Sequence, residues 1–173
     1  MFPKILVIYL REDDPRKNTV AKMIRFGFAE RVTYRHIPGK PLVLDPYTRI
    51  IAGSWHRPVV DKYGILVYDA SWKKLTPRRF RRIPGIHAKL PPLLPGNPIN
   101  YAKPCMLSSI EATAATLYIT GYDEAYEKLL GLYKWMNTFH TLNKELLEKY
   151  REAKTPQELE QVIKEYWGEK PPC

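Results

Sequence analysis

Long apolar segments are absent from this sequence of 173 residues. No run of about 18 apolar residues occurs, so we expect no transmembrane helix. The opening residues, MFPKILVIYL, carry an apolar run that is too short for the core of a signal peptide, and no small-residue cleavage site follows it. We therefore expect a cytoplasmic protein without a membrane partner, and we interpret the opening run as a buried strand.

Cysteine and histidine are scarce, and the common nucleotide-binding motifs are missing. The two cysteines, Cys105 and Cys173, lie far apart and form no CxxC pair, which argues against a disulfide framework and a zinc site. None of the four histidines has metal-ligand spacing. No GxGxxG or GxxxxGK(S/T) motif is present, which disfavours a Rossmann-type site and a P-loop. We therefore expect no disulfide framework, no metal and a reducing cellular location.

Acidic residues are few in the first 107 residues, which hold 7 Asp and Glu against 20 Lys and Arg. Residues 108–173 hold 11 against 8, and the whole chain has a net charge of +10. Such segregation is typical of a protein whose basic part faces a polyanion. The alternative is a basic surface without a partner, as in thermophile proteins rich in Lys and Glu. The separation of the charges favours a nucleic acid.

Short apolar segments alternate with helix signals in the first part of the chain. Asn18 is a preferred helix N-cap residue, and Pro58 stands near the first position of a second helix that Gly64 ends. Strand–helix–strand alternation favours an α/β sheet. Strands are predicted at residues 4–10, 42–44, 50–51 and 65–68, and helices at residues 20–29 and 57–63.

The second part of the chain changes character twice. Residues 77–104 hold 7 of the 16 prolines, which predicts a long irregular segment of the kind that is usually functional or disordered. From Ser108 the chain becomes helical, because Ser108 and Glu111 form a capping-box pattern and Gly121 provides a stop. Further helices are predicted near residues 123–133, 135–150 and 155–167.

Two acidic segments are candidates for chemistry. Residues 12–15, Glu-Asp-Asp-Pro, follow the first predicted strand. Their carboxylates suit a metal site or acid–base chemistry, but such a segment is more commonly a solvated turn. Asp69 stands at the carboxyl end of a buried strand, where α/β folds place their ligands. Trp72 offers a π face to a cation such as a sulfonium. The alternative is that Asp69 caps a helix and Trp72 fills the core.

A run of basic residues indicates nucleic-acid binding more specifically than the acidic segments indicate chemistry. Residues 73–89 contain no Asp or Glu, and Phe80 is interleaved among their basic side chains. This is the composition expected for phosphate contacts beside a stacking residue, although charge runs are often solvated faces. The predicted RNA contacts are Lys17, Lys22, Arg25, Lys73, Lys74, Arg78, Arg79, Arg81, Arg82 and Lys89.

Seven short motifs follow one another along the chain. They are DPRKNT at 14–19, LDP at 44–46, DASW at 69–72, NPINY at 97–101, PCMLS at 104–108, YITG at 118–121 and NKELL at 143–147. This ordered series resembles the small-subunit rRNA aminocarboxypropyltransferases (acp transferases) of ribosome biogenesis, in their archaeal form. The resemblance covers residues 4–150 without a break in order, which makes it specific. Ala70 departs from the family pattern, which has Cys at this position.

The resemblance implies an activity, a cofactor and a fold. Such enzymes transfer the 3-amino-3-carboxypropyl (acp) group of S-adenosylmethionine (SAM) to N3 of a uridine-type base, and they release 5′-methylthioadenosine. The implied fold is a SPOUT-like α/β domain with a trefoil knot, at residues 1–105, followed by a helical domain at residues 106–173. The implied partner is small-subunit rRNA or a pre-ribosomal particle, bound by a monomer.

The resemblance also implies roles for individual residues. Thr19 would hold the carboxylate of the acp chain, Trp72 would enclose the SAM methyl group, and Asp69 would stabilise the sulfonium or accept the N3 proton. The remaining implied SAM contacts are Tyr68 at the ribose, Pro91 and Cys105 at the adenine, and Ser109.

Two other functions fit parts of the pattern. A SPOUT-type RNA methyltransferase would release S-adenosylhomocysteine in place of methylthioadenosine. A non-catalytic rRNA-binding assembly factor would need the basic run alone and would not bind SAM.

Overall fold

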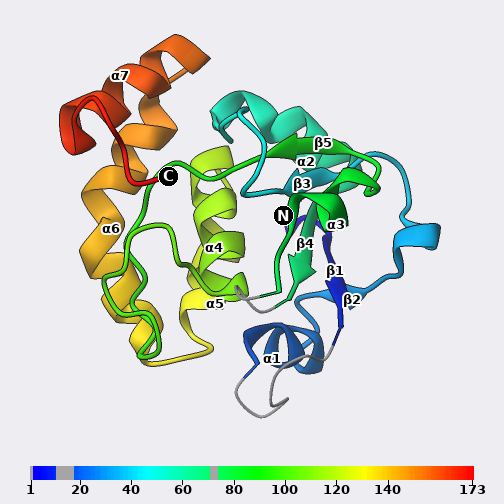
Figure 1. The fold of residues 1–173 in the computed structure, drawn as a ribbon. Helices are drawn as coiled ribbons and strands as arrows, with labels where there is room; N and C mark the ends of the chain where they lie inside the picture. The colour runs from blue at the N-terminus through cyan, green and yellow to red at the C-terminus, as the bar shows by residue number, and fades with distance from the viewer. Residues whose placement is uncertain (1, 11–17, 71–73) are drawn as a thin grey trace.

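A five-stranded parallel sheet forms the centre of the computed structural model, which describes residues 2–10, 18–70 and 74–173 (Figure 1). The strand order is β2-β1-β4-β3-β5, and every pair of neighbouring strands is parallel. All carboxyl ends therefore meet at one edge, which is where ligands bind in open α/β sheets. The strands are β1 (Ile5–Tyr9), β2 (Glu30–Arg31), β3 (Leu42–Leu44), β4 (Ile65–Asp69) and β5 (Ile86–Ala88).

Helices surround the sheet and make up the last third of the chain. Contacts join α4 to α1 and β4 on one side and to α5 and α6 on the other, so α4 connects the sheet with the C-terminal helices (Figure 1). The helices are α1 (Thr19–Arg25), α2 (Arg57–Tyr63), α3 (Pro77–Arg81), α4 (Ser109–Thr120), α5 (Asp123–Leu130), α6 (Trp135–Glu152) and α7 (Pro156–Trp167), with 3-10 turns η1 (Tyr34–His36) and η2 (Ser54–His56).

The predicted helix boundaries are confirmed where a capping residue defined them. The Asn18 side chain accepts the amide of Ala21 at 3.0 Å, and Ser108 and Glu111 form the predicted capping box. Gly121 ends α4 with a left-handed φ of 92°, a conformation that glycine adopts without a steric penalty. The helix predicted at 20–29 is shorter than expected, because Phe26 already forms its C-cap.

Three short elements depart from the sequence predictions. Residues 77–104 were expected to be irregular, but they contain α3 and β5, which are five and three residues long. The two-residue strand β2 was not predicted, and residues 50–51 contribute one bridge, from Ile51 to Lys89, in place of a strand. Elements this short show too few turns or alternations for periodicity to reveal them.

The two faces of the sheet pack against apolar clusters of different size. One face packs Ile5, Val7 and Ile65 into a large apolar cluster that includes side chains of all the C-terminal helices. The opposite face packs Leu6 and Leu66 into a smaller cluster with Phe80 of α3 and Ile83. The large cluster is continuous from the sheet to α7, and a domain boundary between residues 105 and 106 stays a prediction.

A disulfide bond between Cys105 and Cys173 contradicts the expectation that these cysteines form no disulfide. The C-terminal segment returns to the loop before α4, so the Cα atoms of two residues separated by 68 positions lie 6.2 Å apart (Figure 1). Sequence spacing carries no information about such a return. The argument for a reducing location from unpaired cysteines therefore loses its basis.

Replacing Cys173 by serine should lower the free energy of unfolding by about 4 kcal/mol, because the disulfide closes a long loop and restricts the unfolded chain. Urea denaturation of the wild type and Cys173→Ser, each with and without reductant, measures this difference. Reductant should shift the wild-type midpoint and leave that of Cys173→Ser in place. Two titratable thiols in the native, unreduced wild type would contradict the disulfide.

Candidate cofactor and RNA site

Asp69 joins three elements at the carboxyl edge of the sheet. It ends β4 with a side chain that is only 9% exposed. Its Oδ2 accepts a hydrogen bond from Nδ2 of Asn18 at 2.8 Å, and its Oδ1 accepts one from Oγ of Ser109 at 2.8 Å. Asn18 caps α1 and Ser109 begins α4, so this carboxylate holds two helix starts against the end of β4.

Thr19 adds a contact to this group of residues, which we call the Asp69 junction (Asn18, Thr19, Asp69 and Ser109). Its Oγ1 accepts the amide of Ile110 at 3.2 Å, which satisfies a first-turn amide of α4 that has no partner within the helix. The Thr19 hydroxyl hydrogen is not used in this bond and can be donated to a ligand. The residues that the resemblance assigns to SAM at 19, 68, 69 and 109 therefore lie at one edge of the sheet. Asn18 also belongs to this junction, whereas the sequence predicts it only as a helix N-cap.

The charge of Asp69 suits a cationic ligand. The amide of Asn18 and the hydroxyl of Ser109 are neutral donors that orient the carboxylate. A negative charge that is largely removed from water interacts strongly with a nearby cation. The sulfonium of SAM is such a cation, so the residues at this edge fit the cofactor that the resemblance implies. Trp72, the predicted methyl contact, lies outside the described residues.

The C-terminal helices position the proline-rich loop beside this junction. Asn143 of α6 is fully buried, and its side chain accepts the amide of Leu94 at 2.8 Å and donates to the Leu94 carbonyl at 2.7 Å. The hydroxyl of Tyr150 donates to the Pro92 carbonyl at 2.7 Å and accepts from Nε1 of Trp167 at 2.9 Å. The loop is thus held by side chains that follow it by about fifty residues or more.

Glu111 fixes the next part of the loop. Its carboxylate is fully buried and accepts four hydrogen bonds, from the amide of Gly96, the side chain of Asn97, and the amide and hydroxyl of Ser108. Gly96 also lies so close to α6 that an added Cβ would stand 2.5 Å from the amide nitrogen of Phe139. The loop backbone between residues 92 and 97 is therefore well defined.

The two predicted adenine contacts lie in this loop region. Pro91 is buried and has no amide hydrogen, so only its carbonyl is able to take part in backbone recognition. Cys105 adopts a left-handed φ of 68°, and its amide donates to the carbonyl of Leu93 at 3.0 Å. A contact from Cys105 to an adenine would thus use its carbonyl. Both roles stay predictions.

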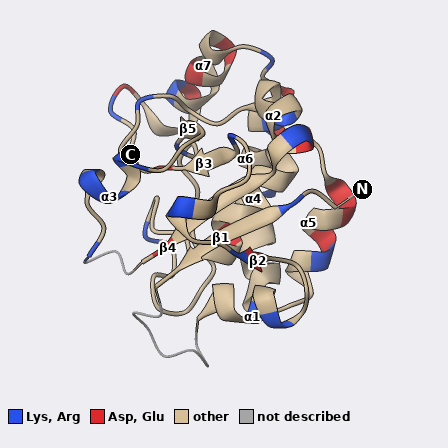
Figure 2. Cartoon of the chain, turned by 90° about the vertical axis from the view of Figure 1, so that its right-hand side faces the viewer, with Lys and Arg blue, Asp and Glu red and all other residues tan. Residues whose placement is uncertain are grey.

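The predicted RNA contacts divide among separate elements. Arg78, Arg79 and Arg81 belong to α3 and Arg82 caps it, whereas Lys89 follows β5. On α1, Nζ of Lys22 lies 4.0 Å from the ring centroid of Tyr133, and the Arg25 guanidinium lies 5.6 Å from that of Phe26. Figure 2 shows basic segments on α3 and α1 and acidic ones on α5 and α7. Lys17 and Lys73 lie outside the described residues, and Lys74 begins the segment that leads to α3.

A polar triad anchors the C-terminal end of the basic helix. The Nδ1 atom of His87 lies 2.8 Å from Oδ2 of Asp45, and its Nε2 lies 2.7 Å from the carbonyl of Ile83. Asp45 follows β3 and also accepts the amide of Tyr47 at 2.8 Å. These contacts link the LDP segment to the turn after α3 and so fix the position of this arginine-rich helix.

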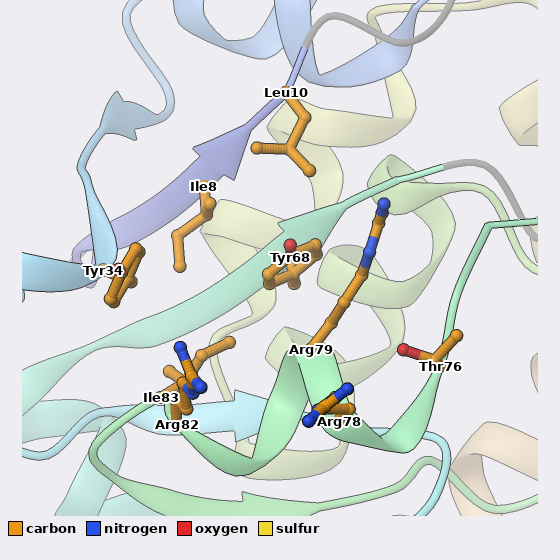
Figure 3. Close-up of a pocket in the computed structure, with 9 residues that line it drawn as sticks. All are labelled: Ile8, Leu10, Tyr34, Tyr68, Thr76, Arg78, Arg79, Arg82 and Ile83. Atoms are coloured by element: carbon orange, nitrogen blue, oxygen red, sulfur yellow. The ribbon is translucent and has the colours of Figure 1, made fainter.

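A hollow of about 540 Å³ opens beside α3 on the less covered face of the sheet (Figure 3). Tyr34 and Tyr68 contribute aromatic rings to it, and Arg78, Arg79 and Arg82 contribute guanidinium groups. Sequence analysis did not single out Tyr34, because it lies in a short 3-10 turn and follows no motif. The residues that line the hollow come from three separate parts of the chain, near residues 8–10, at Tyr34 and between Tyr68 and Ile83.

Metal-binding clusters and membrane-spanning helices are absent from the described ranges. Across residues 2–10, 18–70 and 74–173, no group of three or more His, Cys, Asp or Glu side chains is arranged to hold a metal ion. In the same ranges, no helix is both long and apolar enough to span a bilayer. The acidic segment at residues 12–15, a candidate metal or acid–base site in the sequence, lies outside these ranges.

The fold and the site define an α/β protein with a candidate ligand site at the carboxyl edge of a parallel sheet, beside an arginine-rich helix. Residues 42–167 match the family described as "Ribosome biogenesis protein, C-terminal". Over 169 residues the chain is 41% identical to the 16S rRNA aminocarboxypropyltransferase of Sulfurisphaera tokodaii, which covers 96% of this chain and 99% of that protein. The corresponding protein of Thermoplasma volcanium is 40% identical, with coverages of 95% and 98%.

A solved structure is also similar over almost the whole length. It is that of the SAM-dependent rRNA:acp-transferase Tsr3 from Vulcanisaeta distributa, with a TM-score of 0.84 and 35% identity. The match covers 95% of this chain and 97% of that one. The chain therefore belongs to the 16S rRNA aminocarboxypropyltransferase family of ribosome biogenesis proteins.

Replacing Glu111 by glutamine should destabilise the protein by about 3 kcal/mol, because the new amide group faces hydrogen-bond donors that the carboxylate satisfied. Urea denaturation measures the effect. The control is Glu127→Gln on the exposed surface of α5, which should change the free energy of unfolding by less than about 0.5 kcal/mol. Equal effects of the two variants would contradict the structural role of Glu111.

Proposed function

We propose that this protein is a SAM-dependent aminocarboxypropyltransferase that acts on 16S rRNA. The observation that carries the proposal is the Asp69 junction at the sheet edge, in a chain that is similar over nearly its full length to enzymes of this name. The basic α3 beside that edge supports a polyanionic acceptor.

SAM supplies the acp group, whose methylene next to the sulfonium is transferred, and 5′-methylthioadenosine is the leaving group. In our proposal, Thr19 donates its hydroxyl to the acp carboxylate, and the main chain of Tyr68 binds the ribose. Pro91 and Cys105 contact the adenine, and Ser109 keeps Asp69 in place. Trp72 encloses the methyl group, so that the acp methylene faces the acceptor.

The acceptor atom in this proposal is N3 of a uridine-type base. Both oxygens of Asp69 already accept a hydrogen bond from the protein. This favours a role in holding the sulfonium over a role as the general base that takes the N3 proton. Positioning of the base against the acp methylene then provides much of the rate acceleration.

Five further features belong to the proposal. They are a SPOUT-like fold with a trefoil knot, a boundary near residue 105, catalysis without a metal, a monomeric state and a cytoplasmic location. The parallel sheet with its ligand edge and the chain's family support the fold assignment.

The transferred group distinguishes this function from its alternatives. The protein should be incubated with unmodified small-subunit rRNA and SAM labelled either in the carboxypropyl chain or in the methyl group. We expect only the carboxypropyl label in RNA, with release of methylthioadenosine. Transfer of the methyl label alone would establish a methyltransferase. Absence of both SAM binding and transfer would leave an rRNA-binding assembly factor.

Replacing Asp69 by asparagine should weaken SAM binding about tenfold, which corresponds to about 1.4 kcal/mol, because the variant loses the charge that faces the sulfonium. Isothermal titration calorimetry measures the affinity. S-adenosylhomocysteine has a neutral thioether, so its affinity should stay nearly constant. The matched control Asp61→Asn, on the exposed side of α2, should bind both ligands as the wild type does. Equal losses for both ligands would show that Asp69 acts through the fold.

A further inference from the structure

Consecutive residues of β4 direct their side chains to opposite faces of the sheet. Asp69 points toward Asn18 and Ser109, on the face that α1 and α4 cover. Tyr68 points to the other face, where its ring centroid lies 5.2 Å from that of Phe80 in α3. β4 therefore separates the hollow beside Tyr68 from the Asp69 junction. The hollow is a candidate ligand site on the opposite face of the sheet.

The walls of this hollow combine flat apolar surfaces with positive charge. Figure 3 shows Tyr34 and Tyr68 projecting on either side of Ile8, with Arg79 and Arg82 beside them. Tyr34 is 47% exposed, so its ring remains accessible to a ligand. Phe80 is buried, and its ring packs against the ring of Tyr68. The hollow is in the range of roughly 300–1,000 Å³ that is usual for small-ligand sites.

The charge of the hollow selects the kind of ligand. No acidic side chain is among the nine residues that line it. The guanidinium groups of Arg78 and Arg82 form no hydrogen bond or ion pair with any other residue in the described part of the chain, so they are available to an anion. A cationic sulfonium would be repelled here, which argues against SAM, whereas a phosphate would be attracted.

We propose that this hollow holds one unpaired nucleotide of the rRNA that neighbours the modified nucleotide. Its base packs against the rings of Tyr34 and Tyr68, and its phosphate pairs with the guanidinium groups of Arg78 and Arg82. Because the hollow and the Asp69 junction lie on opposite faces of β4, the nucleotide in the hollow is not the one that is modified. The site therefore sets the register in which the RNA strand crosses the sheet edge. This inference rests on the proposed function.

A double-mutant cycle between protein and RNA tests the proposal. The RNA is a 16S rRNA fragment that the wild type modifies, and its nucleotides near the acceptor are made abasic one at a time. Fluorescence anisotropy measures the affinity of each fragment for the wild type and for Tyr34→Ala. Stacking on one aromatic residue corresponds to about tenfold in affinity. We expect Tyr34→Ala and one particular abasic position each to cost about tenfold, and the two together to cost no more than either alone.

Two variants separate this effect from a general disturbance. Tyr34→Phe keeps the ring and should keep wild-type RNA affinity and the same response to the abasic position. Tyr166→Ala removes a ring of similar exposure, 40%, from α7 and should leave the affinity for RNA unchanged. SAM affinity should be equal in all variants, which confirms that they fold.

Losses that add at every abasic position would overturn the nucleotide site and leave the transferase function intact. A wild type that transfers no acp group to any rRNA fragment would overturn the proposed function, and the nucleotide site with it. The two failures are therefore distinguishable by the activity of the wild type alone.

Discussion

The hydrogen bonds of Asp69 are the constraint on which the site depends. A carboxylate at the end of β4 receives one bond from the cap of α1 and another from the first residue of α4, so two helices that begin ninety residues apart start at the same point. Thr19 adds a bond to the first turn of α4. A parallel sheet makes this geometry available, because all its strands end at one edge. The same bonds fix the orientation of the carboxylate that we propose for the sulfonium of the cofactor.

The C-terminal helices complete the site by ordering a loop that has little regular structure of its own. Asn143 and Tyr150 bind the loop carbonyls of Leu94 and Pro92, and Glu111 binds Gly96 and Asn97. Each of these side chains is buried, so each bond replaces water that the loop backbone would otherwise need. The helical part thus orders the loop near the carboxyl edge of the sheet, and its acidic segments on α5 and α7 lie apart from α3 (Figure 2).

The two faces of β4 carry two different candidate sites. The well-covered face carries the Asp69 junction, where burial strengthens the interaction of a carboxylate with a cation. The sparsely covered face carries the hollow with Tyr68 and the arginines, which remains open to a large anionic partner. In our proposals, adjacent residues of one strand therefore contact two ligands of opposite charge. The alternation of side chains along a strand would keep these ligands on opposite faces of the sheet.

The sequence alone determined the family, the α/β class, the helix starts at Asn18 and Ser108, and the candidate residues Thr19, Asp69 and Ser109. These features depend on local chemistry, such as caps and apolar runs, or on motif order. Only the tertiary structure decided that Asp69 bonds to both Asn18 and Ser109, that Tyr34 and Tyr68 share a hollow with α3, and that Cys173 reaches Cys105. Each of these depends on how distant segments pack. One sequence does not encode such proximity in its spacing, because the path of the chain between the segments is set by the whole core.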